Sequence, residues 1–135
     1  MKVMILVISV AFCSAVFGVQ KDELAESIAR GKTIYNDYCV SCHLDNGEGI
    51  EGSFPPLAKA DFLTKFPEQS IYAVKFGMEG KIVVNGKEYD NMMPNPGLEP
   101  AQVADVMNYI RNSWGNNSGK KMVTVKMVEA VKEKK

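Results

Sequence analysis

Two cysteines and a histidine form the segment of this sequence with the strongest chemical signal. The run is Cys39-Val40-Ser41-Cys42-His43, in which two thiols stand three positions apart and an imidazole follows directly. At that spacing both thiols can reach the two vinyl groups of one haem while the imidazole of His43 reaches its iron. The pattern therefore predicts covalent attachment of one haem c through Cys39 and Cys42.

Three other interpretations of a Cys-x-x-Cys pair compete: a redox-active dithiol, half of a zinc site and a structural disulfide. The redox motif belongs to a βαβ pattern, which is absent around Cys39. Zinc needs a fourth ligand, whereas His43 is the only histidine and Cys13, the third cysteine, lies in a segment that we expect to be removed. The sequence favours haem attachment over all three.

The sixth position of the iron must be filled without a second imidazole from the same molecule, because the chain has a single histidine. Methionine or an open position remains. Met107 falls on the apolar face of an expected helix, whereas Met92 and Met93 lie in an irregular loop beside Pro94, which can cross the far side of a haem. The remaining candidates, at a helix end or in the tail, are Met78, Met122 and Met127. We expect Met93 to be the ligand, with Met92 as the alternative.

The N-terminus has the layout of a signal peptide. Lys2 precedes an apolar run from Val3 to Phe12, small residues follow, and charged sequence begins soon afterwards. The run is shorter than the about 20 apolar residues that cross a bilayer. We expect residues 1–18 to be removed after Gly18, together with Cys13, and the mature protein to be in the periplasm.

Charge is unevenly distributed along a chain whose formal net charge is zero. Residues 19–115 contain 9 Lys and Arg against 14 Asp and Glu, whereas residues 116–135 contain 6 Lys against 2 Glu. An acidic body disfavours nucleic acid as a partner, and membrane contact is expected only through the basic tail. Residues 116–135 begin with a polar, glycine-containing run, so we expect a loosely held extension.

Residues 19–115 are expected to form one domain made mostly of helices, because chains of this length rarely divide. Apolar periodicity and proline or glycine signals predict helices over residues 22–39, 61–65, 67–76 and 100–114. Asn85-Gly86 stands between short apolar stretches and predicts a hairpin over residues 82–89. The Gly-, Asn- and Pro-rich segment 43–56 is expected to be a loop.

Several motifs occur in an order typical of one family. Gly31 and the aromatic Tyr35 precede the Cys-x-x-Cys-His run, a Pro-x-Leu motif follows at 55–57, and Met93 precedes a proline. On these residues the sequence resembles the class I c-type cytochromes, the bacterial monohaem cytochrome c family, from Gly31 to Gly115. Two further segments are similar to those of close bacterial members: residues 84–89 and 109–115.

The resemblance implies an all-α cytochrome c fold, with three to five helices around one covalently bound haem and a small β-hairpin before the methionine loop. It implies that the first and last helices cross at right angles, with Gly31 allowing their close approach and Tyr109 packing there. It also implies that a backbone carbonyl near Pro55 accepts a hydrogen bond from Nδ1 of His43, which turns Nε2 toward the iron.

Iron held by an imidazole and a thioether is coordinatively full, which favours electron transfer over enzymatic chemistry. The soft sulfur ligand and burial of the haem both raise the reduction potential, so we expect a positive value. We expect a monomeric, periplasmic single-electron carrier between a dehydrogenase or respiratory complex and a terminal reductase or oxidase. The alternatives are a fixed cytochrome subunit of a larger oxidoreductase, and a haem enzyme or gas sensor with a labile sixth ligand.

Overall fold

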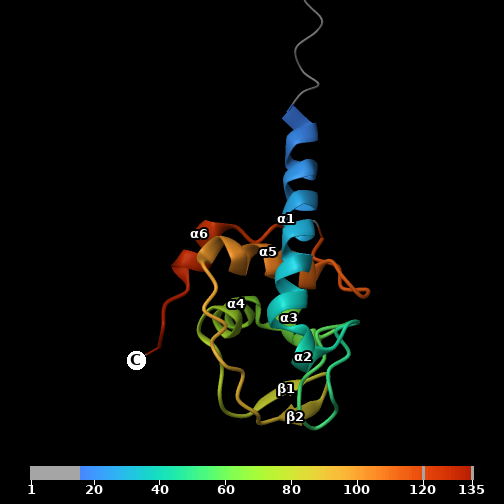
Figure 1. Ribbon diagram of the computed structural model, residues 1–135, viewed down its shortest axis with the longest axis vertical. Helices are drawn as coiled ribbons and strands as arrows, with labels where there is room; N and C mark the ends of the chain where they lie inside the picture. The colour runs from blue at the N-terminus through green and yellow to red at the C-terminus, as the bar shows by residue number, and fades with distance from the viewer. Residues whose placement is uncertain (1–15, 120, 135) are drawn as a thin grey trace, which may run out of the picture.

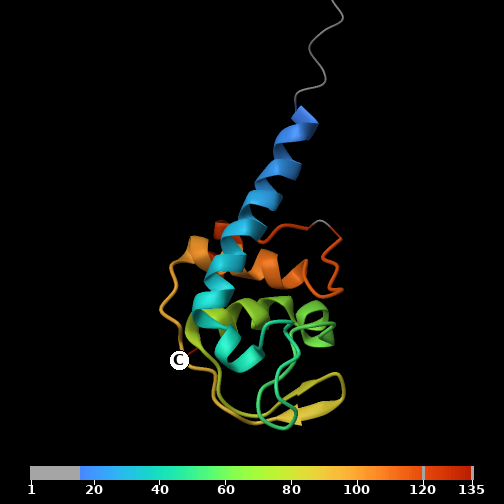
Figure 2. The same ribbon diagram turned by 45° about the vertical axis from the view of Figure 1, so that its right-hand side comes forward.

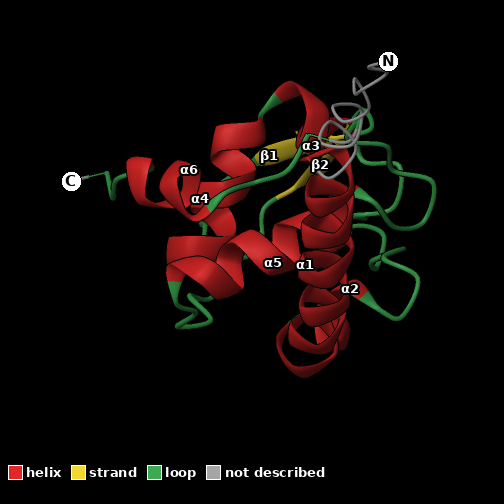
Figure 3. Ribbon diagram, turned by 90° about the horizontal axis from the view of Figure 1, so that it is seen from above, coloured by secondary structure: helices red, strands yellow, loops and turns green. Residues whose placement is uncertain are grey.

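A computed structural model describes residues 16–119 and 121–134 of the chain. Within these residues, six helices and one two-stranded sheet follow one another as α1 (Val16–Tyr38), α2 (Val40–His43), α3 (Asp61–Lys65), α4 (Pro67–Phe76), β1 (Ile82–Val84), β2 (Lys87–Tyr89), α5 (Pro100–Arg111) and α6 (Val125–Ala130) (Figure 1). The predicted class, helical with one small hairpin, is confirmed (Figure 3). Helices α2 and α6 are not predicted as separate helices from the sequence, and the total of six in the described residues exceeds the expected three to five.

The expected signal peptide lies mostly outside the described residues, which begin inside α1 at Val16. No helix in the described part of the chain combines the length and apolar character needed to cross a membrane.

Proline and glycine set the ends of the central helices, as the sequence predicts. Pro67 occupies the first turn of α4, and Gly77 follows its last residue with a φ of 82°. Pro100 opens α5 behind Glu99, whose carboxylate and Gln102 form a reciprocal capping box.

The expected continuation of the last helix to Trp114 is wrong, because α5 ends at Arg111. Side chains beyond its end bind the last carbonyls of the helix: Asn112 donates to Asn108 O, and Ser113 donates to Tyr109 O. These bonds satisfy carbonyls that another helical turn would otherwise have used. Trp114 then takes a positive φ of 52° and leaves the helix axis.

The turn of the β1–β2 hairpin contacts the first residue of α3. Val84 pairs with Lys87, and both turn residues, Asn85 and Gly86, have positive φ values of 51° and 77°. Asn85 exchanges two hydrogen bonds with Asp61: its side chain accepts from the backbone N–H at 2.9 Å, and its backbone N–H donates to the carboxylate at 2.7 Å. The predicted hairpin is confirmed, and this side-chain exchange anchors it.

Helices α1 and α5 cross at close range, which Figure 2 shows from the side. A Cβ atom at Gly31 would overlap the backbone carbonyl of Asp105 and lie 2.8 Å from the Cβ of Tyr109. One turn later, the ring of Tyr35 lies 5.4 Å from that of Tyr109 and 5.0 Å from that of Trp114, measured between centroids. The implied close approach at Gly31 is confirmed, and an aromatic cluster extends it.

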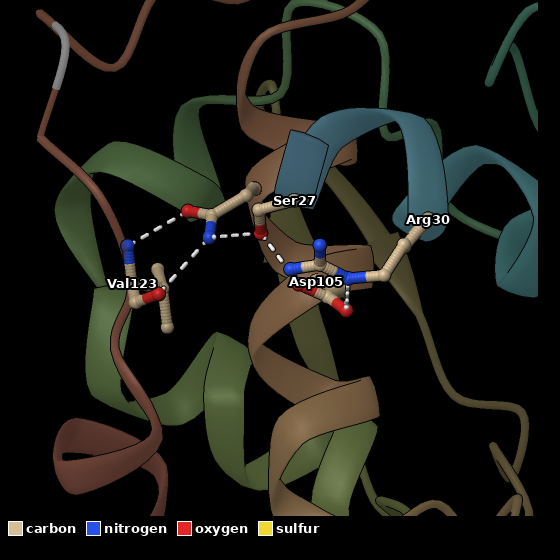
Figure 4. Close-up of polar contacts among 5 residues, drawn as sticks. Ser27, Arg30, Asp105 and Val123 are labelled. Carbon is tan, nitrogen blue, oxygen red and sulfur yellow. Dashed lines mark hydrogen bonds and ion pairs between the residues drawn. The ribbon is translucent and has the colours of Figure 1, made fainter. Parts of the chain in front are cut away.

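A polar network spans the same helix crossing (Figure 4). The carboxylate of Asp105 accepts hydrogen bonds from Ser27 at 2.6 Å and from two nitrogens of Arg30 at 2.7 and 2.9 Å. The fully buried amide of Asn108 donates to Ser27 Oγ and to the carbonyl of Val123, and accepts from Val123 N–H. Since no fully buried side-chain nitrogen or oxygen of the described residues lacks a hydrogen-bond partner, burying the network carries little penalty.

The expectation of a loosely held C-terminal extension is wrong for residues 121–131. Val123, Val128 and Val131 are at most 5% exposed and belong to the hydrophobic core. The lysines of this part of the chain at positions 121, 126 and 132 face solvent. The valines are spaced so that one side of the segment packs inward while the lysines stay in water.

Replacing Gly31 with alanine is expected to lower the free energy of unfolding by about 2 kcal/mol, because the added methyl group displaces α5 from α1. In an exposed helix the same substitution stabilises by about 0.5–1 kcal/mol, so the sign of the effect tests the contact. Chemical unfolding followed by circular dichroism measures it. Lys32→Ala, at the exposed neighbouring position, is the matched control. A Gly31→Ala protein at least as stable as the parent would contradict the close approach.

Candidate functional site

The Cys-x-x-Cys-His run lies at the end of α1 and forms one helical turn. Cys39 N–H donates to Tyr35 O at 2.9 Å, and His43 N–H donates to Cys39 O at 3.0 Å. Cys39 and Cys42 are half-buried free thiols, so the structure contains no disulfide between them. Burial, followed by the charge of Cys42, raises the pKa of Cys39 to about 11, which keeps this thiol protonated at neutral pH.

The ring of His43 is buried and held in one orientation. It is 8% exposed, and its Nδ1 lies 2.9 Å from the backbone carbonyl of Pro55. A carbonyl oxygen only accepts hydrogen bonds, so Nδ1 carries the proton and Nε2 is the basic nitrogen. Desolvation lowers the pKa of His43 despite the opposing effect of the Pro55 carbonyl, and this favours the neutral imidazole that binds metals.

Nε2 of His43 is available to a ligand. The only side-chain hydrogen bond of His43 in the described structure is the one through Nδ1, so Nε2 has no protein partner there. The implied bond between His43 and a carbonyl near Pro55 is confirmed, and it leaves the correct nitrogen for an iron atom.

The loop after His43 is held in place by two glycines that the sequence analysis did not single out. Gly49, with a φ of 65°, lies so close to the backbone that a Cβ atom would be 2.7 Å from Pro55 O. Gly47 lies against Trp114, where a Cβ atom would be 2.6 Å from the indole ring. Both positions have the positive φ and the close neighbours that favour glycine, and the close approach at Gly49 is to the same Pro55 carbonyl that His43 contacts.

The methionine loop pairs with the end of α4. Met78 and Met93 exchange two backbone hydrogen bonds, of 2.9 and 2.7 Å, in an isolated antiparallel bridge. Gly77 allows this pairing, since a Cβ atom there would lie 2.7 Å from Met93 O. Met93 is half-buried and packs against the core, whereas Met92 is 66% exposed. Local sequence patterns do not predict this pairing of Met78 with Met93, because the two residues lie far apart in the sequence.

A cavity of about 1010 Å³ opens beside Met93. Met78 and Met92 also contribute to its wall, as do aromatic side chains that come mainly from α3 and α4: Phe62, Phe66, Tyr72 and Phe76. The residues of the Cys-x-x-Cys-His run are not part of this wall. Cys39 and Met93 both pack against the cluster of buried residues that forms the hydrophobic core.

These residues fit a covalently bound haem. The donor set consists of two free thiols, a neutral imidazole with an open nitrogen and a half-buried thioether beside a large cavity with aromatic walls. A zinc site fits less well, because the described residues contain no cluster of three His, Cys, Asp or Glu side chains able to hold a metal.

Comparison with known proteins agrees with this chemistry. The family model described as Cytochrome c matches residues 28–114. A cytochrome c-552 of Thermus thermophilus is 37% identical over 120 residues, which cover 83% of this chain and 80% of that protein.

Two further relatives are much longer than this chain. The cytochrome c subunit of the quinone alcohol dehydrogenase of Gluconobacter oxydans is 32% identical, over 65% of this chain and 19% of that protein. The cbb3-type cytochrome c oxidase subunit FixP of a Bradyrhizobium species is also 32% identical, over 72% of this chain and 34% of that protein. With the family match spanning most of the chain, this protein belongs to the cytochrome c family, whose members bind haem and transport electrons.

Proposed function

We propose that the protein is a single-electron carrier with one haem c, attached through Cys39 and Cys42 and ligated by His43 and Met93. The observation that carries this proposal is the hydrogen bond from Nδ1 of His43 to Pro55 O, which fixes Nε2 as the donor nitrogen. The half-buried thioether of Met93 beside an aromatic cavity supports the second ligand. Bound haem would supply a reversible one-electron centre, and the protein residues would hold it and exclude water.

The carrier is proposed to work in the periplasm after removal of residues 1–18. Its partners would be a dehydrogenase or respiratory complex on one side and a terminal reductase or oxidase on the other, because several relatives are named as cytochrome subunits of a dehydrogenase or an oxidase. Lys126 and Lys132 are exposed and could meet an acidic partner or membrane surface.

Attachment through both thiols predicts that the haem stays with the polypeptide after acidic acetone extraction. Intact-mass measurement is expected to give the chain plus one haem. Each single variant, Cys39→Ala or Cys42→Ala, is expected to keep the haem through the remaining thioether, whereas the double variant releases it. Ser41→Ala, between the two cysteines, is the control and should behave like the parent. Retention of haem by the double variant would reject this mode of attachment.

Ligation by Met93 is expected to produce the weak near-infrared absorption band of a methionine–iron bond in the oxidised protein. Met93→Ala should abolish the band and lower the reduction potential by on the order of 100 mV, because axial ligands tune potentials over about 0.8 V and thioether sulfur favours ferrous iron. The exposed neighbour gives the matched control, Met92→Ala, which should retain the band. Loss of the band only in Met92→Ala would assign the ligand to Met92 instead.

A fixed cytochrome subunit of a larger oxidoreductase is the second candidate function, favoured by relatives whose names describe such subunits. A free carrier is expected to elute as a monomer in size-exclusion chromatography and to be fully reduced by a small-molecule donor when isolated from its native host. Isolation only in a fixed ratio with a dehydrogenase or oxidase would favour the subunit.

A further inference from the structure

Lys75, on α4, binds the end of the C-terminal segment. Its ammonium group donates to the carbonyl oxygens of Val128 and Val131 at 2.9 and 2.8 Å. Val128 lies in the last turn of α6, and Val131 directly follows the helix. Carbonyls at the C-terminal end of a helix lack partners within the helix and carry partial negative charge, so a cation is favoured there. Lys75 thus supplies hydrogen bonds that α6 cannot make by itself.

The same stretch of α4 faces the cavity next to Met93. Tyr72 and Phe76 line this cavity, and their ring centroids are 5.1 Å apart. The ammonium of Lys75 lies 4.8 Å from the centroid of the Phe76 ring, and that of Lys134 lies 5.7 Å from the centroid of the Tyr72 ring. Both distances are within the range of cation–π attraction. The C-terminal segment therefore contacts α4 next to Tyr72 and Phe76, the aromatic side chains of α4 that line the cavity.

Residues after α6 complete the wall of this cavity: Val131, Lys132 and Lys134. The start of the C-terminal segment is held elsewhere, by the two hydrogen bonds between the backbone of Val123 and the buried Asn108. The contacts of Lys75 act at the other end, where the segment reaches the cavity. Loss of these contacts would free the wall while leaving the Asn108 anchor intact.

We propose that Lys75 is a positioning residue that latches residues 128–134 over the cavity beside Met93 and so limits the access of small exogenous ligands to that side chain. This inference rests on the proposed ligation of haem iron by Met93. An outside molecule could take the place of the Met93 thioether on a bound haem only if it reached the cavity beside Met93. A latched wall lowers the fraction of time in which the cavity is open.

The test compares Lys75→Met, which keeps the length of the side chain but removes the ammonium, with two other variants. Lys126→Met makes the same charge change on an exposed position of α6, and Lys75→Arg restores a cation. Imidazole is added to the oxidised protein, and its rate of binding is followed in the Soret band. Hydrogen exchange of the amides of residues 128–131 is measured on the same samples.

Lys75→Met is expected to bind imidazole about tenfold faster than the parent, equivalent to about 1.4 kcal/mol in the opening of the wall. Faster hydrogen exchange of the 128–131 amides should accompany the faster binding. Lys126→Met should match the parent in both measurements, and Lys75→Arg should give values between those of the parent and Lys75→Met. Equal imidazole binding rates in Lys75→Met and Lys126→Met would overturn the latch, whatever the effect on stability.

The near-infrared band of the parent protein separates this outcome from failure of the proposed function. If the parent shows the methionine–iron band and the rates do not differ, the latch is rejected and the ligation stands. If the parent lacks the band, Met93 ligation is rejected, and the latch proposal is rejected as well because it depends on that ligation.

Discussion

The contact between Gly31 and the backbone of Asp105 is the constraint on which the placement of the site depends. It allows α1 and α5 to pack without an intervening side chain at this point, and Cys39 directly follows the end of α1, about two helical turns beyond Gly31. The same approach brings Tyr35 against Trp114, which covers Gly47 in the loop after the Cys-x-x-Cys-His run. A wider helix crossing would therefore displace both the run and the loop that supports it.

Orientation of His43 follows from this packing rather than from the motif alone. The Cys-x-x-Cys-His spacing specifies a helical turn with an imidazole at its end, but the ring could rotate freely there. Gly49 lets the chain fold back so closely that Pro55 O reaches Nδ1. Because that carbonyl can only accept a hydrogen bond, one tautomer is selected and Nε2 is free. The loop thus sets the orientation of the side chain that we propose as an iron ligand.

The sequence correctly predicts those helix and hairpin boundaries that are set by a proline or by an Asn-Gly pair at the boundary itself. Pro67, Pro100 and the Asn85-Gly86 pair mark boundaries through fixed φ angles or positive φ, and the structure follows them. The C-terminal segment was mispredicted because its lysines dominate the composition, while its buried valines depend on partners distant in sequence. The pairing of Met78 with Met93 escaped prediction for the same reason.

The C-terminal segment connects the helix crossing to the cavity, and its two anchors differ in strength. Val123 binds Asn108, which is fully buried and also bonded to Ser27 on α1. At the far end, Lys75 is only half-buried, so water can replace its bonds at modest cost. Local opening should therefore begin at the Lys75 end and leave α1 and α5 packed. The cavity wall can then move without loss of the contact that orients His43.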